Sequence, residues 1–545
     1  MISDDLKKLI VGDVKADDET LFAYSHDYSV FEVKPAVVVY PKNHDDVKTL
    51  VRFVGDHKTA DPPLSLTARS AGTDMSGGPL NESIILDFTK YFNQIKEIGP
   101  DHAVVEPGVY FRDFEKAIDA KGLLYPPYPA SKDLCAMGGI VSNNSGGEKT
   151  LMYGQTREYV EAVSLILSDG EEHTFRELSA DELQTKLNEK SFEGNLYQKI
   201  YKLIEDNYDD IKKAKPAVTK NSAGYALWDV WDRKTFNLAQ LIVGAQGTLG
   251  IMTQARIKLI PKKKRSRLAV IFIHDLNIFG NIIEAARVVH PESLEFYDDK
   301  TLGVALRFLP DLVARMREGL LTLALEFLPE FFMALRGGMP KIILLVELTG
   351  EDDQEITKRM GVLKESVATF PVQIRVLRDE KEARKYWTVR RASFALLHEH
   401  NRDRATVPFV DDVIVRPEDL PSFLPKINAI IDKHKKKMIY TIAGHAGDGN
   451  IHIIPLMDLK DPEARALIPE VTDEVYKLVL EYKGSITAEH NDGLIRTPYL
   501  KDMYGEKIYG LFEDVKKIFD PQNIFNPRKK VGGDMAYALA HIKKK

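Results

Sequence analysis

Three glycine-rich segments constrain the fold of this 545-residue chain more than any other feature. They are Arg69–Gly78, Gly138–Gly147 and Gly244–Ile251, and all three fall within about 180 residues. Glycine allows tight turns and close approach of the backbone to a ligand, and successive N–H groups can surround a phosphate. The first segment is neither a P-loop nor a GxGxxG dinucleotide motif. An ordinary turn explains one such segment equally well, but three of the same character indicate one extended polar ligand.

Apolar runs and amphipathic stretches surround these segments in an order typical of alternating strands and helices. Ala36–Tyr40 is predicted to be a strand, and Asn43 to cap the helix that follows it. Further predicted elements are the strands Leu64–Ala68, Ile84–Phe88 and Ala103–Glu106 and a helix over Phe111–Lys121.

Size and composition indicate a soluble protein of two or three domains. The chain is 44% hydrophobic and 29% charged, as globular proteins are, and its net charge of −6 gives no reason to expect nucleic acid. Its one cysteine, Cys135, excludes an intramolecular disulfide and an iron–sulfur cluster of its own. The N-terminus has no signal-peptide pattern, so cytoplasmic residence is expected.

The second half has a different pattern, and we expect a domain boundary at the basic run Lys262–Arg265. Strand–helix–strand units beyond it predict an α+β domain with helices on one face of an antiparallel sheet. The apolar stretch Gly319–Met339 contains Glu326, Glu330 and Arg336, which argues against a transmembrane helix. It is expected to belong to a helical insertion that covers a groove or lies on a membrane surface, and both alternatives stay open. Residues 498–519 are predicted to be helical.

Two histidines at a second glycine-rich turn are the strongest candidates for chemistry. His445 and His452 flank Ala446–Ile451, at the edges of two predicted strands, and Glu489 and His490 follow downstream. Two imidazoles and a carboxylate are a common ligand set for a divalent metal with an open position. The alternative is a turn whose histidines bond only to backbone. A calcium loop starting at Asp448 is excluded, because Ile453 occupies the position that needs glycine.

Taken together, these motifs resemble the vanillyl-alcohol-oxidase/p-cresol-methylhydroxylase (PCMH) class of flavoproteins, in its D-lactate, glycolate and D-2-hydroxyglutarate dehydrogenase branch. The resemblance rests on the order of the motifs along the chain: the three glycine-rich segments, then HxGDGNxH, then the Glu-His pair and the closing Phe519–Pro527. The implied fold is α+β: a two-subdomain PCMH-type FAD-binding domain and a substrate, or cap, domain with an antiparallel sheet and helices. The implied divisions are a helical lead-in (1–32), the FAD-binding domain (33–263), the cap (264–484, insertion about 300–338), a C-terminal FAD-linked oxidase segment (485–530) and a basic tail (531–545).

The resemblance implies three groups of FAD-binding residues. They are Arg69, Ser70, Ala71, Gly72, Thr73, Asp74, Met75 and Ser76; Pro127, Met137, Gly138, Gly139, Ser142, Asn143, Asn144, Gly146 and Gly147; and Gly247, Thr248, Gly250, Ile251 and Asn526. Thr73 stands where covalent relatives carry a flavin-linking histidine, so FAD is expected to be non-covalent. Cys135 is expected to be a small buried residue, and Gln246 replaces the usual glutamate of the third segment.

By the same resemblance, His445, His452 and Glu489 would bind a divalent metal, Zn with Mn or Fe as alternatives. His490 would be the catalytic base and Arg390 would bind the substrate carboxylate, although a surface arginine is an alternative for Arg390. The implied reaction is oxidation of a D-2-hydroxy acid by hydride transfer to flavin. Val410 and Ile454 stand where the 2-hydroxyglutarate enzymes carry polar substrate residues, which argues for a D-lactate-like substrate.

Two other functions are compatible with the superfamily: a non-redox transferase of the alkylglycerone-phosphate synthase type, and a non-catalytic FAD-binding subunit of a larger dehydrogenase. The expected electron acceptor of a dehydrogenase is a quinone, an electron-transfer flavoprotein or an iron–sulfur protein. The sequence makes no prediction of the oligomeric state.

Overall fold

The structure is a computed structural model that describes residues 2–59, 61–308, 311, 338–401 and 403–544. The expected insertion and its membrane contact fall mainly on residues 312–337, outside the described residues. Within the described part of the chain, no helix has both the length and the apolar character needed to cross a bilayer.

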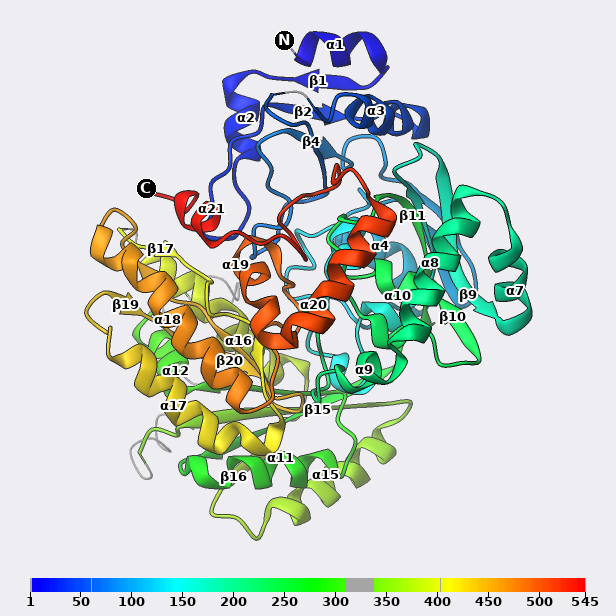
Figure 1. The fold of residues 1–545 in the computed structure, drawn as a ribbon. Helices are drawn as coiled ribbons and strands as arrows, with labels where there is room; N and C mark the ends of the chain where they lie inside the picture. The colour runs from blue at the N-terminus through cyan, green and yellow to red at the C-terminus, as the bar shows by residue number, and fades with distance from the viewer. Residues whose placement is uncertain (1, 60, 309–310, 312–337, 402, 545) are drawn as a thin grey trace.

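A four-stranded sheet forms the first subdomain, at the top of Figure 1. Its order is β1 (Asp13–Lys15), β2 (Val37–Tyr40), β4 (Ile84–Asp87) and β3 (Leu66–Arg69), with β2, β4 and β3 parallel. Helix α3 (His44–Asp56) begins at Asn43, whose side chain accepts a hydrogen bond from the Asp46 N–H, as predicted. The predicted apolar face of α3 is buried, with Val47, Leu50, Val51 and Val54 in the core of this sheet. Helices α1 (Ile2–Leu9) and α2 (Asp18–Tyr24) precede it.

A six-stranded antiparallel sheet forms the second subdomain, on the right of Figure 1. Its order is β10 (Thr235–Asn237), β9 (Glu172–Ser179), β8 (Val160–Ile166), β11 (Ile251–Lys258), β6 (His102–Val105) and β5 (Ile95–Ile98). Helices α4 (Phe111–Asp119), α7 (Ala180–Asn188), α8 (Phe192–Asp206), α9 (Tyr208–Lys213) and α10 (Ala239–Ile242) accompany it. The predicted C-terminal helix, α20 (Leu500–Phe519), packs Phe512 and Val515 into the core of this subdomain. The end of the chain therefore returns to its first half.

The second glycine-rich segment differs from our prediction of a loop. Its first part is helix α5 (Met137–Asn143), which ends at Asn144 with φ +52°. A Cβ on Gly138 would lie 2.7 Å from the Cβ of Pro107. Glycine is needed here for close packing and not for a turn, and the pattern alone did not distinguish the two.

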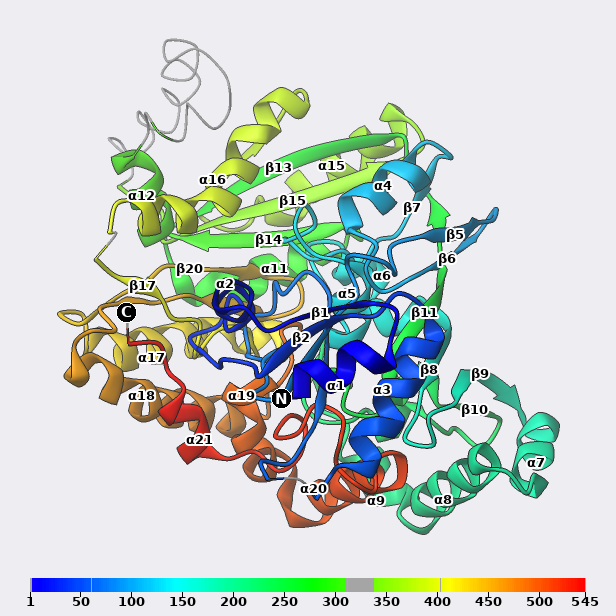
Figure 2. The ribbon, with the colours of Figure 1, turned by 90° about the horizontal axis from the view of Figure 1, so that it is seen from above.

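The cap is built on a seven-stranded sheet whose central strands run side by side in Figure 2. Its order is β16 (Gln373–Val376), β13 (Arg265–Ile273), β15 (Ile342–Gly350), β14 (Ser293–Asp298), β20 (Ile442–His445), β21 (Asn450–Ile453) and β18 (Val413–Ile414). The remaining helices of the cap and C-terminal region include α17 (Leu420–Asp432), α18 (Pro462–Glu481), α19 (Gly493–Arg496) and α21 (Met535–Ala540).

The prediction that helices cover one face of this sheet was wrong. Ala269 and Ile271 share a core with α11 (Phe279–Arg287) and α15 (Asp353–Val367). The alternate residues Leu268 and Val270 pack instead with α12 (Asp299–Arg307) and α16 (Glu380–Glu399). Because successive side chains of a strand point to opposite faces, the apolar run Leu268–Ile273 of β13 is covered on both sides.

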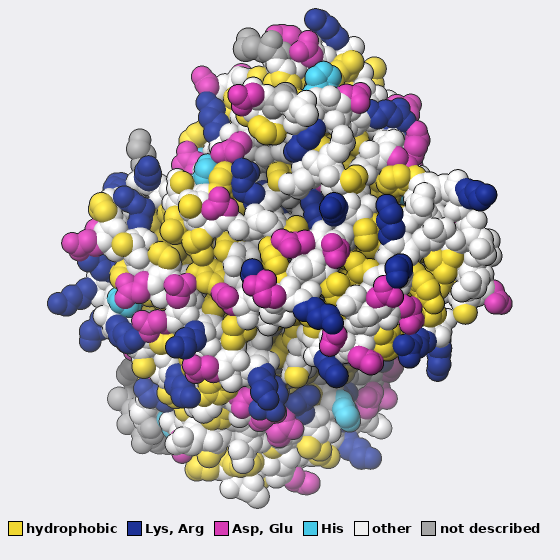
Figure 3. Space-filling model, viewed as in Figure 1, with side chains coloured by type: hydrophobic (Ala, Val, Ile, Leu, Met, Phe, Trp, Pro, Cys, Tyr) yellow, Lys and Arg dark blue, Asp and Glu magenta, His cyan; other side chains and the backbone are white. Residues whose placement is uncertain are grey.

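The molecular surface is mixed in charge on the face that Figure 3 shows. Acidic and basic side chains are interspersed there among apolar ones.

Candidate active site

A β-hairpin places His445 and His452 on one face of the cap sheet. In the pairing of β20 with β21, Ala443 lies opposite His452, and His445 is two residues beyond Ala443 on the same face. The two rings are 5.2 Å apart between centroids and nearly perpendicular. The turn needs its last glycine, because Gly449 has φ +79° and a Cβ there would lie 1.9 Å from the Val415 carbonyl oxygen. The predicted strand–turn–strand arrangement is confirmed.

Glu489 and His490 reach the same region because the chain wraps around the carboxylate of Asp412. Its Oδ2 accepts hydrogen bonds from the N–H groups of Ala488, Glu489 and His490, at 2.9, 2.8 and 2.7 Å. Asn491 follows with φ +66°, so neighbouring side chains do not point to opposite sides as in a strand. The buried carboxylate thereby fixes the backbone that carries both side chains.

Ion pairs connect the predicted metal ligands to charged neighbours. Glu295 accepts a hydrogen bond from His445 Nδ1 at 2.6 Å, and Lys220 Nζ donates to Glu489 Oε1 at 2.6 Å. Burial opposes a charge on His445, but the carboxylates of Glu295 and Glu489 together outweigh it and raise the pKa of the ring to about 9. Burial likewise disfavours ionised Glu489, yet Lys220 and His445 hold its pKa well below the ordinary value.

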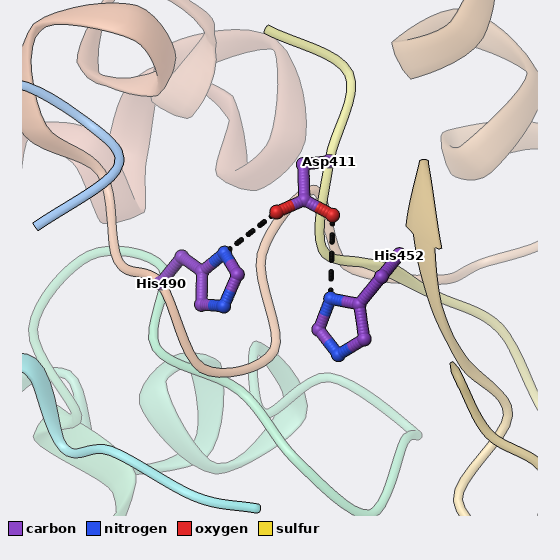
Figure 4. Close-up of side chains that lie close together, drawn as sticks. All are labelled: Asp411, His452 and His490. Carbon is purple, nitrogen blue, oxygen red and sulfur yellow. Dashed lines mark hydrogen bonds and ion pairs between the residues drawn. The ribbon is translucent and has the colours of Figure 1, made fainter. Parts of the chain in front are cut away.

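The carboxylate of Asp411 lies between the imidazoles of His452 and His490 (Figure 4). Asp411 Oδ1 accepts from His452 Nδ1 at 3.2 Å, and Asp411 Oδ2 is 2.8 Å from His490 Nδ1. The second contact is a close ion pair without the alignment of a hydrogen bond. Burial would lower the pKa of His490, but Asp412 and Asp411 raise it to about 9.

Three groups of side chains in the described part of the chain have the donor set for a divalent cation. The ligand atoms of His445, His452 and Glu489 all lie within 4.8 Å of one another, and the same holds for Asp411, His452 and His490 and for Asp412, Glu489 and His490. In the last of these, Asp412 Oδ2 already accepts from three backbone N–H groups. In the second group, Asp411 already takes the Nδ1 atoms of both rings. In the group of His445, His452 and Glu489, His445 Nε2 and the ionised Glu489 face the space between the side chains, so this group fits a cation better.

The three glycine-rich segments are joined to one another by hydrogen bonds between neutral side chains and by one carboxylate, that of Asp74. Asn143 Nδ2 donates to Asp74 Oδ2 at 2.9 Å, and Gln246 Nε2 donates to Asn143 Oδ1 at 3.4 Å. Asp74 Oδ1 also accepts from the Ser76 and Gly78 N–H groups, at 2.6 and 3.0 Å. The side chains that these segments contribute therefore hold the loops together.

A cavity of about 460 Å³ joins the glycine-rich segments to the imidazole cluster. Of the predicted FAD-binding residues, those that line it are Arg69, Ser70, Gly72, Thr73, Asp74, Met75, Gly138, Gly139, Ser142, Asn143, Gly146, Gly147, Gly247 and Gly250. All predicted metal and catalytic residues line it too: His445, His452, Glu489, His490 and Arg390. One ligand in this cavity would contact both regions.

The other predicted FAD-binding residues lie behind the cavity wall. They are Ala71, Ser76, Pro127, Met137, Asn144, Thr248, Ile251 and Asn526, and all except Ala71 are buried. Asn526 shows how such a residue acts: its Nδ2 donates to the carbonyls of Gly78 and Gln246, at 3.0 and 2.7 Å, and so ties the first segment to the third. Cys135 is buried beside the cavity, and burial raises the pKa of its thiol to about 12.

Sequence reasoning missed the charged neighbours of the site: Glu295, Asp411, Asp412, Lys220 and Arg496. Arg496 is fully buried and donates to the carbonyls of Ile486, Asn491 and Asp411. One feature of the sequence could have indicated these residues: a charged residue inside an apolar run, such as Glu295 within Ser293–Phe296. A buried charge needs a partner, but the pattern does not name that partner.

Comparisons with known proteins agree with this geometry. The family model "FAD binding domain" matches residues 35–176, and "FAD linked oxidases, C-terminal domain" matches 262–530. Together they span most of the chain, which therefore belongs to the FAD-linked oxidases that carry this FAD-binding domain. Within this family, the similarity is to the branch of D-2-hydroxyglutarate dehydrogenase and glycolate oxidase.

The similar proteins are distant in sequence from this chain. The chain is 27% identical over 550 residues to glycolate oxidase subunit GlcD of Bacillus subtilis, covering 98% of both chains. It is 26% identical over 533 residues to D-2-hydroxyglutarate dehydrogenase of Pantoea ananatis, covering 95% of this chain and 50% of that one. This chain thus spans about half the length of that relative.

Solved structures share the fold. The 4-ethylphenol oxidase of Gulosibacter chungangensis matches with a TM-score of 0.68 at 17% identity, covering 96% of this chain and 95% of that one. An alkyldihydroxyacetonephosphate synthase matches with a TM-score of 0.66 at 12% identity, covering 96% and 84%. At these identities the matches establish the PCMH-type α+β fold alone.

Proposed function

We propose that the chain is an FAD-dependent dehydrogenase that oxidises a D-2-hydroxy acid of the D-lactate type to its 2-oxo acid. The observation that carries this proposal is the shared cavity. It is lined by the three glycine-rich segments, two of which lie within the matched FAD-binding domain, and by His445, His452, Glu489, His490 and Arg390. When bound, a divalent cation would acidify the substrate hydroxyl, and FAD would accept the hydride.

The predicted cation ligands are His445, His452 and Glu489. Their donor atoms are close together and Glu489 is ionised. Binding would require His445 to release the proton that Glu295 favours, as metal binding to histidine commonly does. Two histidines and a glutamate suit Zn, with Mn or Fe as alternatives.

His490 is the proposed proton acceptor. Its Nδ1 faces Asp411, so the substrate proton would go to Nε2. Only the neutral imidazole can accept a proton, and the pKa of His490 is raised to about 9. The ring must therefore lose a proton before it acts, which the positive charge of a cation bound nearby would favour.

Arg390 is the proposed partner of the substrate carboxylate. Its Nη2 donates to Glu295 at 3.1 Å, while its buried Nε has no hydrogen-bond partner among the described residues, and the residue lines the cavity. An unpaired buried N–H is costly, so a carboxylate that accepts from it would bind favourably.

Two apolar positions favour a substrate with one carboxylate. Ile454 lines the cavity, and Val410 is buried in the apolar core. Neither can pair with a second carboxylate, so D-lactate fits better than D-2-hydroxyglutarate.

Anaerobic mixing with D-lactate, L-lactate, glycolate and D-2-hydroxyglutarate tests this function through the flavin absorbance. We expect D-lactate to bleach the flavin fastest and L-lactate not to bleach it. Failure of every 2-hydroxy acid to bleach it would refute the proposal and favour the non-redox transferase or the non-catalytic FAD-binding subunit. The alkyldihydroxyacetonephosphate synthase similarity supports the fold and gives the transferase no separate support.

The flavin is proposed to be non-covalent, because Thr73 occupies the linking position and lines the cavity. Acid precipitation should release all flavin as FAD, and flavin that stays with the precipitated chain would contradict this. The proposed acceptor is a quinone, an electron-transfer flavoprotein or an iron–sulfur protein, and the proposed residence is cytoplasmic, with peripheral contact at the inner face of the membrane as a further proposal.

A further inference from the structure

Two buried carboxylates each connect a predicted metal ligand to a second residue of the site. Glu295 joins His445 to Arg390, with contacts of 2.6 and 3.1 Å. Asp411 joins His452 to His490, with contacts of 3.2 and 2.8 Å. One carboxylate thus serves substrate binding and the other serves the proton acceptor.

We propose that Asp411 is a positioning residue that sets the tautomer of His452 and His490 together, so that both rings present Nε2 to the cavity. The part that concerns His490 as a base rests on the proposed function. The part that concerns the tautomers rests on geometry alone.

The tautomers follow from the chemistry of the carboxylate. An ionised carboxylate can only accept hydrogen bonds, so the Nδ1 atom of each ring that faces it must carry hydrogen. The Nε2 atom of a neutral ring then has its lone pair free. In Figure 4 this second nitrogen points away from Asp411 in both rings. Metal ligands in proteins are oriented by such carboxylates, but here the same group also holds the base.

Asp411 cannot easily turn away from the two rings. Its side chain is fully buried, and Oδ1 also accepts from the Ile453 N–H at 3.1 Å. Its carbonyl accepts from Arg496 at 2.7 Å. The position of the carboxylate is therefore fixed from both the main chain and the side chain.

These contacts make Asp411→Asn an unusually informative change. An asparagine has one accepting and one donating end. The Ile453 N–H and His452 Nδ1 both need an acceptor at the Oδ1 position, so the amide oxygen should stay there. The NH2 group then faces His490 Nδ1 and requires the opposite tautomer, with hydrogen on Nε2. His452 would remain a ligand while His490 would lose its accepting nitrogen.

The experiment compares Asp411→Asn, Asp411→Ala and Glu295→Gln with the wild-type holoenzyme. Calorimetric titration of chelated protein with Zn2+ gives metal affinity without any substrate, and FAD content and thermal melting check folding. Stopped-flow flavin reduction, reported as kcat and KM, gives the effect on chemistry. The ¹⁵N shifts of labelled histidine, at a pH where the ring is neutral, report the His490 tautomer directly, with His490→Ala assigning the signal.

For Asp411→Asn we expect a Zn2+ affinity within about tenfold of wild type and a loss of about 10³–10⁴-fold in kcat with little change in KM. The same exchange in the serine-protease triad costs about 10⁴-fold, because the histidine adopts the wrong tautomer. Asp411→Ala should also weaken Zn2+ binding, by about 10–100-fold. Glu295→Gln, the matched change in the other carboxylate, should weaken Zn2+ binding, because Glu295 holds His445, and should raise KM, because it frees Arg390. Its kcat at saturating Zn2+ should change little, because His490 stays in place.

Three results would overturn the proposal: an unchanged His490 tautomer in Asp411→Asn, a kcat within about threefold of wild type, or an equal loss of Zn2+ affinity in the Asn and Ala variants. If no hydroxy acid reduces the wild-type flavin, the proposed function fails, while the tautomer and Zn2+ measurements still decide the role of Asp411. If the Ala variant does not fold, the isosteric Asn variant and Glu295→Gln carry the test.

Discussion

The two walls of the cavity use different chemistry. The wall from the first half of the chain consists mainly of glycines, amides and hydroxyls, with a few charged side chains such as Arg69 and Asp74 among them. We call it the neutral wall, and bonds such as Asn143 to Asp74 and Asn526 to Gly78 hold it together. The opposite wall, which we call the charged wall, consists of paired charges from the cap and C-terminal segments, such as His445 with Glu295. Lys220, from the first half of the chain, joins it by pairing with Glu489. A glycine-rich wall can follow the shape of a large cofactor, whereas buried charges fix a few donor atoms at the reacting end.

This difference predicts that changes in the two walls have separable effects. Changes in the charged wall should alter flavin reduction or metal affinity and leave FAD bound. Changes in the neutral wall should alter FAD affinity and leave chemistry intact once FAD is saturating.

The largest effect is expected for His490→Ala in the charged wall. Removing a positioned proton acceptor should slow flavin reduction by about 10²–10⁴-fold, with FAD and metal retained. Rapid-mixing spectroscopy measures the rate, and metal analysis provides the control. Loss of metal in this variant together with its retention in Glu489→Gln would show that the two roles are reversed.

Glu489→Gln should act on the metal. We expect Zn2+ binding to weaken by at least about 10–100-fold, the loss typical for a residue that only supports a ligand, because a neutral amide replaces an ionised ligand whose pKa is held low. Added Zn2+ should restore part of the flavin-reduction rate. A rate that does not respond to added metal would argue against a ligand role.

The charged wall should also make the stability of the chelated protein depend on pH. The pKa of His445 is raised from 6.5 to about 9, so its protonated ring stabilises the folded state fully below about pH 6.5. That contribution is lost as pH rises through about 9. The buried Lys529, whose pKa burial lowers to about 7, acts in the opposite direction. The difference in unfolding free energy between wild type and His445→Gln isolates the histidine.

We expect that difference to shrink as pH rises from 6.5 to 9 in denaturant titrations of chelated protein. A difference that grows over this range would contradict the assigned ion pair with Glu295.

The smallest effect is expected in the neutral wall. Asn143→Ala removes the hydrogen bond to Asp74, which is worth about 1 kcal/mol. FAD should bind about fivefold more weakly, with an unchanged reduction rate at saturating FAD. A large loss of rate at saturating FAD would show that this wall takes part in chemistry.

The same contrast explains how much the sequence could predict. The glycine-rich segments and the His445–His452 hairpin are local patterns, and the structure confirms that they meet. The helix at Met137–Asn143 was missed because glycine marks close packing as well as turns. The partners of the charged wall are far apart in the chain: Glu295 and His445 are separated by 150 residues, and Lys220 and Glu489 by 269. No local pattern connects such pairs, since only the tertiary fold brings them together.

The predicted cap sheet shows a similar limit. Its strands and helices occur near the expected positions, but their assignment to one face was wrong. The continuous apolar run of β13 indicated that helices cover both faces of the sheet, because a strand covered on both faces does not alternate apolar with polar residues.

Chelation of the holoenzyme tests the central claim most directly, because it removes the cation without changing either wall. Flavin content and the rate of flavin reduction by D-lactate would be measured before and after chelation and after return of Zn2+. The separation of the two walls predicts that FAD stays bound, that reduction is abolished and that Zn2+ restores it. Reduction at the normal rate in chelated enzyme, or release of FAD together with the metal, would contradict it.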